Sequence, residues 1–273
     1  MSGIHCCVAV TRQEIDDALR VRWAVFGEEM GLIAEAPGAP REVDAFDTLE
    51  TTLHFVAYAD GRAVATVRLL LPNPEVARAR GGRLGVDLER KFDLQGLGAA
   101  EGVVAEATRF CVLAPYRRAG AVEALDALMR RESRRRGVTH WIAAANAETD
   151  AAEDARIIQR VAERMGFWSR RFQALPIGDE APPAPERCPF YTPEERERAR
   201  AGDLAGLRLP RALVVFARRL GARFTGEPRY DARFRRFAMP LVAAVDLAAA
   251  EREESAAAWP APAWGASPAG AAA

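Results

Sequence analysis

The chain has 273 residues, of which 49% are hydrophobic and 28% charged, and this composition is typical of a globular protein with a sizeable core. Its formal net charge is +0, so the overall charge gives no reason to expect nucleic-acid or membrane binding. Four cysteines without a CxxC pair and only three histidines argue against a metal site. Without a secretion signal or a run of about 20 apolar residues, we expect a cytoplasmic protein with no stable membrane insertion.

Strands and helices alternate along the predicted chain. The first half of the pattern predicts a strand at 4–10, a helix from Thr11 to about Met30, a hairpin at 53–71, an irregular segment at 72–102 with a short helix near 86–92, a strand at 103–113 and a helix at 121–136. The second half predicts a strand at 140–145, a helix at 151–165, a strand at 167–175, a linker or lid at 176–189, helices at 193–202 and 210–220, and strands at 221–226 and 237–247. The pair Thr11 and Glu14 is a capping box, and Asp60-Gly61 is a strong hairpin turn. This order predicts an α/β (α+β) protein with a mixed, largely antiparallel sheet.

One stretch, VAEATRFCVLAPYRRAGA at 104–121, combines a strand, a turn and the start of a helix. Free N–H groups and the helix dipole at such a place favour a bound phosphate. Arg117 and Arg118 add positive charge there. An ordinary connection with two solvated arginines is the alternative that the residues leave open.

The carboxylate of Glu106 follows Val103, Val104 and Ala105 in this strand. Burial among apolar residues raises the pKa of a carboxyl group toward values useful for a general base. The alternative is a structural ion pair with Arg109. Side chains three residues apart face opposite sides of a regular strand, so that ion pair requires a bulge.

Several segments, taken in order, resemble the GNAT superfamily of acyltransferases. The similarity is greatest to the branch that uses acyl carrier protein: long-chain N-acyl amino acid synthases, ornithine N-acyltransferases and acyl-homoserine-lactone synthases. The segments that carry it are Arg22-Trp-Ala-Val-Phe26, Glu42-Val-Asp44-Ala-Phe-Asp47, His54, Arg68-Leu-Leu-Leu-Pro72, Glu106-Ala-Thr-Arg109-Phe-Cys-Val112, Ala162-Glu-Arg-Met-Gly166-Phe167 and LGARFTGEPRYD at 220–231.

The resemblance implies a GNAT-like fold, with a mostly antiparallel central sheet, a splayed V-shaped cleft and helices on both faces. We expect an acyltransferase core at 1–175, a C-terminal helix-strand extension packed on it at 176–247, and a disordered Ala/Pro-rich tail at 248–273.

The resemblance also implies the activity. We expect transfer of a medium or long acyl chain from acyl carrier protein, or from acyl-CoA, to the amine of an amino acid or related small molecule by direct attack on the thioester. No tightly bound cofactor is expected, because acyl-phosphopantetheine or acyl-CoA is the donor substrate. The alternatives are an acyl-homoserine-lactone synthase, an acetyl-CoA N-acetyltransferase, or a non-catalytic module that binds an acyl group or a partner.

The resemblance assigns the site residues as follows. The predicted catalytic residues are Glu106 and Arg109, the predicted donor-binding residues are Cys111, Val112, Leu113, Arg117, Arg118, Ala119, Gly120 and Ala121, and the predicted acceptor-binding residues are Arg22, Phe26, Asp44, Asp47, His54 and Arg68. The amides at 111–113 are expected to face the thioester oxygen. Arginines at 117–118, 130–136 and 170–171 are expected to contact an acidic carrier protein, although solvated helix faces explain such residues equally.

Two departures from the family pattern bear on the donor and on the chemistry. In the phosphate-binding loop Q/R-x-x-G-x-G/A, Val122 occupies the last position, where a β-branched side chain hinders close approach to a diphosphate. A carrier-protein arm brings a single phosphate and tolerates this better. Ala162 replaces the tyrosine that many relatives use as general acid, so the sequence leaves the proton donor unidentified.

Overall fold

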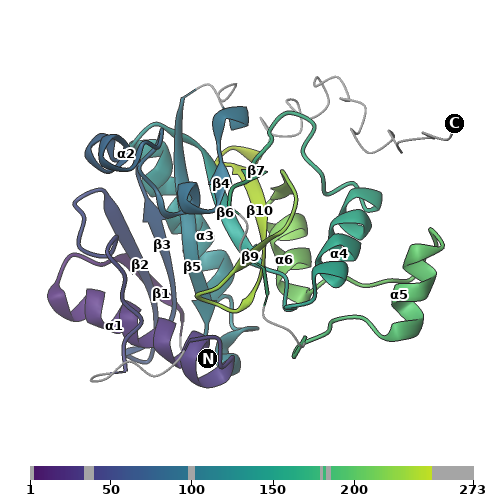
Figure 1. Cartoon of the computed structure of the whole chain (residues 1–273). Coiled ribbons are helices and arrows are strands. Elements are labelled where there is room, and N and C mark those ends of the chain that lie inside the picture. Colours follow the sequence, from purple (N-terminus) through teal and green to yellow (C-terminus); the bar gives the residue numbers. More distant parts are fainter. Residues whose placement is uncertain (1–2, 34–39, 98–101, 179–180, 183–185, 248–273) are drawn as a thin grey trace, which may run out of the picture.

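A computed structural model describes residues 3–33, 40–97, 102–178, 181–182 and 186–247 (Figure 1). The predicted tail at 248–273 lies outside these residues. The strands are β1 (His5–Val8), β2 (Thr52–Ala59), β3 (Arg62–Leu70), β4 (Phe92–Asp93), β5 (Val103–Val112), β6 (Val138–Asn146), β7 (Leu175–Pro176), β8 (Arg223–Phe224), β9 (Arg229–Asp231) and β10 (Arg236–Ala244). The α-helices are α1 (Arg12–Trp23), α2 (Pro74–Arg80), α3 (Ala121–Arg135), α4 (Ala152–Arg164), α5 (Pro193–Arg200) and α6 (Arg211–Arg219).

A single large sheet organises the chain. Its strand order is β1-β2-β3-β5-β6-β10-β8, with β9 also paired to β10. All these pairs are antiparallel except β5 with β6, which are parallel. The predicted mixed, mostly antiparallel sheet is therefore confirmed. The C-terminal strand β10 pairs with β6 inside this sheet, while the division into 1–175 and 176–247 stays a prediction.

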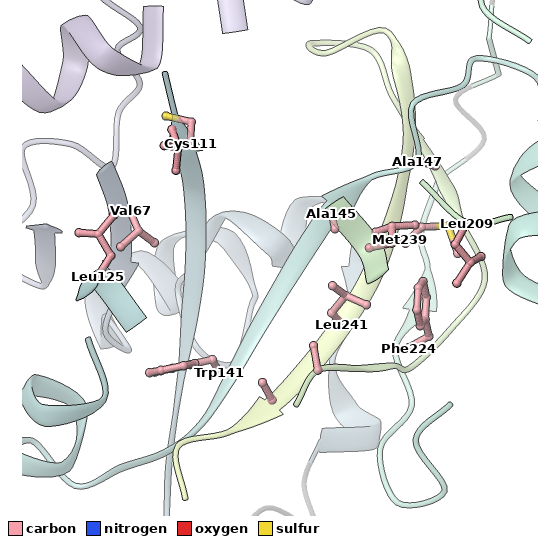
Figure 2. Packing of buried hydrophobic residues seen from close by; sticks show 14 of the residues in the cluster. Val67, Cys111, Leu125, Trp141, Ala145, Ala147, Leu209, Phe224, Met239 and Leu241 are labelled. Atoms are coloured by element: carbon pink, nitrogen blue, oxygen red, sulfur yellow. The ribbon is translucent and has the colours of Figure 1, made fainter. Parts of the chain in front are cut away.

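Helices cover both faces of the sheet (Figure 1). Adjacent residues of β3 point to opposite faces. Val67 lies against Leu125 of α3 in the hydrophobic core (Figure 2). Arg68, on the other face, shares the carboxylate of Asp47 with Arg22 of α1. The buried charges thus lie on the face opposite α3, beside a second apolar cluster that includes Leu70 and Val104.

The strands β5 and β6 separate in the middle of the sheet. They are paired only from Val103 to Glu106 on β5 and from Val138 to Ile142 on β6. Beyond Glu106, β5 continues to Val112 without β6 as a partner, and Figure 2 shows the strands diverging toward Cys111 and Ala145. The predicted splay of the sheet is present and begins at Glu106.

The predicted strand at 167–175 is wrong. In place of a continuous strand there are an isolated bridge from Trp168 to Phe224 and the two-residue strand β7, which begins only at Leu175. The hydroxyl of Ser169 accepts the N–H groups of Arg171 and Phe172, at 3.3 Å and 3.1 Å. This local turn takes up backbone donors that a strand would offer to its neighbour. The sequence patterns also missed α2 and β9.

The first helix begins as the capping box predicted. The Thr11 hydroxyl accepts the N–H of Glu14 at 3.2 Å, and the Glu14 carboxylate accepts the N–H of Thr11 at 2.8 Å. At the other end, α1 leads into a π-helical segment, Ala24–Glu29. None of the helices in the described residues combines the length and apolar character needed to cross a bilayer.

The variant Thr11→Ala is expected to lower the free energy of unfolding by about 1 kcal/mol, because one helix N–H loses its acceptor. Chemical denaturation with an unchanged m-value measures this loss. The matched control is Gln13→Ala on the exposed first turn of the same helix, which should change stability by less than about 0.5 kcal/mol. Equal losses in the two variants would contradict the capping role.

Candidate active site

A bulge in β5 shapes the edge that faces the gap beside β6. Opposite the bulge, Arg68 of β3 pairs with Thr108 and Thr66 pairs with Cys111, so β5 holds one residue more than β3 between these pairs. Within this segment Arg109 has a φ of +59°, a conformation that a non-glycine residue rarely adopts. A bulge, which the alternative Glu106–Arg109 ion pair would have needed, is therefore present at Arg109.

Past the bulge, the backbone of Val112 faces the gap. The N–H of Leu113 donates to the carbonyl of Val64 in β3 at 2.9 Å. Because backbone directions alternate along a strand, the amide of Val112 points the opposite way. Its carbonyl accepts Arg117 Nε at 3.1 Å on that side. Three N–H groups were predicted to face a thioester. The N–H of Val112 points toward the gap, whereas the N–H groups of Cys111 and Leu113 point toward β3.

Glu106 lies at the point where the two strands separate. Its side chain is buried, and its Oε2 accepts the N–H of Leu88 at 2.8 Å. Burial, followed by the nearby charge of Asp87, raises the pKa of Glu106 to about 7. Arg109 pairs with other carboxylates, so the alternative Glu106–Arg109 ion pair is not present among the described contacts. This environment is the one that sequence reasoning predicted for a general base.

A buried ion-pair network lies on the same side of the sheet. Its members are three arginines and three carboxylates: Arg22, Arg68, Arg109, Glu42, Asp44 and Asp47. The side chains are at most 8% exposed. Such groups persist in a protein interior only when each charge is paired and hydrogen-bonded. The structure therefore brings the predicted acceptor residues together, and it adds Glu42, which had appeared only within a motif.

Within the network the arginine side chains already bind the carboxylates of Asp44 and Asp47. Arg68 Nη1 donates to both Asp44 and Asp47 at 2.7 Å. Burial raises the pKa of Asp44, but the guanidinium groups of Arg68 and Arg109 outweigh burial and hold it below its ordinary value. The role of these aspartates in acceptor binding stays a prediction, and in the structure they orient arginines.

Two neighbouring side chains in this region keep unpartnered polar atoms among the described residues. Arg68 is fully buried, yet its Nε and Nη2 have no hydrogen-bond partner. His54, opposite Arg68 on β2, lies with Nε2 3.2 Å from the carbonyl oxygen of Asp47, and its Nδ1 is likewise unpartnered. Burial lowers the pKa of His54. Because buried donors are costly when unpaired, Arg68 is suited to bind an anionic group of a ligand.

The predicted phosphate site lies at the N-terminus of α3. Gly120 caps this helix with a φ of +82° and no side-chain cap, which leaves the first N–H groups of the helix free of a capping oxygen. Arg118, Ala119 and Gly120 are exposed, and Ala121 is buried. Arg117 is bound to Glu29 and to the Val112 carbonyl, so it organises the turn from the side of the gap.

A turn from the C-terminal segment covers the ion-pair network. Arg233 pairs with Glu42 and lies 3.7 Å from Asp44, while the neighbouring Phe234 ring lies against Arg109. No motif in the sequence indicates this part of the site. Contacts between residues more than 120 positions apart leave no spacing signal along the chain.

An acyl chain needs an apolar lining, and the sequence offers four aromatic candidates for it: Phe26, Phe55, Phe110 and Trp168. Phe55 is fully buried in the core, and Phe26 packs on Phe234 beside the ion-pair network. Phe110 lies past the bulge on β5 and meets Phe216 of α6 with ring centroids 6.0 Å apart. Phe110 and Trp168 are partly buried at the edge of the core, so these two remain candidates.

Two further expectations concern Ala162 and Arg130. Ala162 is buried in the core on α4, and its methyl group offers no proton donor. Arg130 had been grouped with the surface arginines, but it is buried and donates to the carbonyls of Leu220, Ala244 and Val245. It is therefore a structural residue, and its inclusion in a docking surface was wrong.

Residues 21–127 match the family described as the acetyltransferase (GNAT) domain. Over these residues the chain contains an acetyltransferase (GNAT) domain. This confirms the fold and the enzyme class that the motifs predicted. No curated protein matches the sequence.

Solved structures of similar extent include FeeM, an N-acyl amino acid synthase from uncultured soil microbes, with 10% identity, a TM-score of 0.49 and coverage of 90% of this chain and 92% of that chain. The CoA-dependent acyl-homoserine lactone synthase BjaI has 16% identity, a TM-score of 0.44 and coverage of 93% and 90%. A putative N-acetyltransferase from Lactobacillus plantarum has 13% identity, a TM-score of 0.43 and coverage of 89% and 99%.

Proposed function

We propose that the chain is an N-acyltransferase that moves a medium or long acyl chain from acyl carrier protein, or from acyl-CoA, to the amine of an amino acid or related small molecule. One observation carries the proposal. β5 leaves β6 immediately after Glu106, so the Val112 amide faces the resulting gap and a buried carboxyl with a raised pKa stands at its inner end. These are an oxyanion donor and a base, the two groups that aminolysis of a thioester needs.

In the proposed reaction the amine nitrogen attacks the thioester carbonyl carbon, and the carbon–sulfur bond breaks. The Val112 N–H donates to the carbonyl oxygen as negative charge develops there. Glu106 accepts the proton that the amine loses, directly or through one water, and the thiolate leaves with the donor. The side chain of Cys111 is not used, because burial raises its pKa far above that of a free thiol.

The acceptor is proposed to carry an anionic group as well as its amine. The unpartnered Nε and Nη2 atoms of Arg68 lie in the layer that contains Glu106, two residues along β3 from the partner of Glu106 in the sheet. A carboxylate is the group that two guanidinium donors bind well. This supports an amino acid, and the identity of the amino acid is left to experiment.

The donor phosphate is proposed to bind the free N–H groups at the start of α3, beside the exposed Arg118. Val122 follows in the first turn and crowds a diphosphate more than a single phosphate. This favours phosphopantetheine of acyl carrier protein over CoA. The exposed arginines 118, 131, 134 and 135 are proposed to contact the acidic carrier, so raised salt should weaken the apparent affinity for carrier protein.

The experiment mixes the protein with a panel of amino acids and one donor at a time: carrier protein loaded with acyl chains of increasing length, the matching acyl-CoA esters, and acetyl-CoA. Thiol release and mass spectrometry of the product report transfer. Faster transfer from long-chain carrier protein than from acetyl-CoA supports the proposal. Transfer from acetyl-CoA alone identifies an acetyltransferase, lactone formation from an S-adenosylmethionine acceptor identifies a homoserine-lactone synthase, and silence with every donor favours a non-catalytic module.

A further inference from the structure

The turn between β9 and β10, residues 232–235, is held by its own aspartate. Asp231 Oδ1 accepts the N–H groups of Arg233 and Phe234, at 3.0 Å and 3.3 Å. Lys91 pairs with the other oxygen of the same carboxylate at 2.5 Å. Side-chain oxygens that accept N–H groups two and three residues ahead fix the direction of a turn. The residues at the tip therefore have a defined direction.

The turn contacts the N-terminal part of the chain. Arg233 donates to the carboxylate of Glu42 and to the carbonyl oxygen of Val43, the latter at 3.2 Å. Arg235 donates to the carbonyl oxygen of Gly31 at 2.6 Å. Hydrogen bonds from Arg233 and Arg235, the residues before and after Phe234, thus hold the turn to Glu42, Val43 and Gly31.

Phe234 contacts the residue that forms the bulge in β5. Its ring centroid lies 5.2 Å from Arg109 Cζ, within the distance of a cation–π contact, and 5.5 Å from the ring of Phe26 in an edge arrangement. The edge of the same guanidinium binds Glu42 and Asp44. Arg109 is therefore held on its edge by carboxylates and on its face by Phe234.

The backbone of Arg109 has a conformation that needs such support. Its φ of +59° is unfavourable for a side chain with a Cβ atom, and it persists only where the surroundings hold it. The bulge at this residue precedes Val112, whose amide faces the gap between β5 and β6. The strained residue therefore lies three positions before the amide that faces the gap.

We infer that Phe234 is a positioning residue: it braces the Arg109 guanidinium and so holds the β5 bulge that aims the Val112 N–H at the thioester. The inference rests on the proposed function and deepens it, because it makes the C-terminal turn part of the machinery for acyl transfer. It assigns Phe234 no contact with the reacting atoms.

The test compares Phe234→Leu, which keeps apolar bulk against Phe26 but lacks an aromatic face, with Phe234→Tyr, which keeps the face. Steady-state kinetics are expected to show kcat lowered on the order of 10- to 100-fold in the leucine variant, with the donor KM changed by less than about twofold. The tyrosine variant should retain kcat. Phe190→Leu is the matched control. It also removes a partly buried ring that an arginine contacts, since Arg208 Cζ lies 5.7 Å from the Phe190 ring, but it leaves the contacts of Arg109 in place.

Hydrogen exchange of the substrate-free protein supplies a readout that does not depend on activity. The peptide covering residues 106–113 should exchange faster in Phe234→Leu than in the parent chain, and no faster in Phe190→Leu. Unchanged exchange and unchanged kcat in Phe234→Leu would overturn the inference, as would an equal kcat loss in the control. If the parent chain is inactive with every donor, the proposed function fails, and the exchange comparison still decides whether Phe234 braces the bulge.

Discussion

Replacing Glu106 with Gln is expected to lower turnover on the order of 100- to 1000-fold, because the amide cannot accept the proton of the attacking amine. The side chain keeps its size and can still accept the N–H of Leu88 through its carbonyl oxygen, so the fold should be retained. Thiol release measures the rate, and circular dichroism checks the fold. Glu75→Gln, an exposed carboxylate on the first turn of α2, is the control and should leave turnover unchanged. Full activity in Glu106→Gln would exclude the base role.

The pH profile tests the same residue. A base with a pKa of about 7 is active when deprotonated, so kcat/KM should rise about tenfold per pH unit below pH 7 and level off above it. The rise of kcat/KM below pH 7 should be absent in Glu106→Gln. A parent profile that is flat between pH 5 and pH 8 would contradict the assignment.

Replacing Glu106 with Gln should raise the stability of the fold at high pH, although it lowers activity. Its pKa is raised in the folded chain to about 7 from 4.5, so the folded state holds the proton more tightly than the unfolded state. Stability therefore falls as pH rises between these two values. At pH 8 we expect Glu106→Gln to unfold with a free energy higher by on the order of 2 kcal/mol, a gain absent at pH 4. Gain of stability with loss of activity distinguishes a functional carboxylate from a structural one.

Replacing Arg22 with Ala is expected to lower the free energy of unfolding by about 3–5 kcal/mol, because it removes one guanidinium partner from each of two buried carboxylates, Glu42 and Asp47. Arg22 is fully buried, and its Nη1 and Nη2 donate to Asp47 at 2.7 Å and 3.1 Å while it also pairs with Glu42. Thermal unfolding should shift down by roughly 10 °C. Arg22→Lys keeps the charge but lacks the forked donor geometry, so it should lose less.

A surface ion pair serves as the control for the buried one. Arg198 and Asp203 lie 2.7 Å apart, but both side chains are about half exposed, at 47% and 48%. Solvent weakens such a pair, so Arg198→Ala should cost less than about 1 kcal/mol. A loss in Arg22→Ala as small as this would show that the network contributes little to the fold.

The sequence by itself determined the elements that depend on neighbouring residues. The capping box at Thr11 and Glu14 and the turn at Asp60-Gly61 are encoded within four residues, and both are present. The strand over 103–113 and the helix over 121–136 follow from periodicity and agree with β5 and α3 within one residue at each end. The strand predicted at 167–175 is interrupted where the hydroxyl of Ser169 accepts the N–H groups of Arg171 and Phe172.

Only the tertiary structure decided which charges are paired and what encloses them. The family resemblance selected Arg22, Asp47 and Arg68, yet it did not show that the arginines bind the aspartates. The contacts of Arg233 and Phe234 with the network depend on β10 entering the sheet beside β6. Backbone periodicity and local hydrogen bonds act over a few residues, whereas the pairing of buried charges is set by which surfaces meet when the chain packs, and that information is spread over the whole fold.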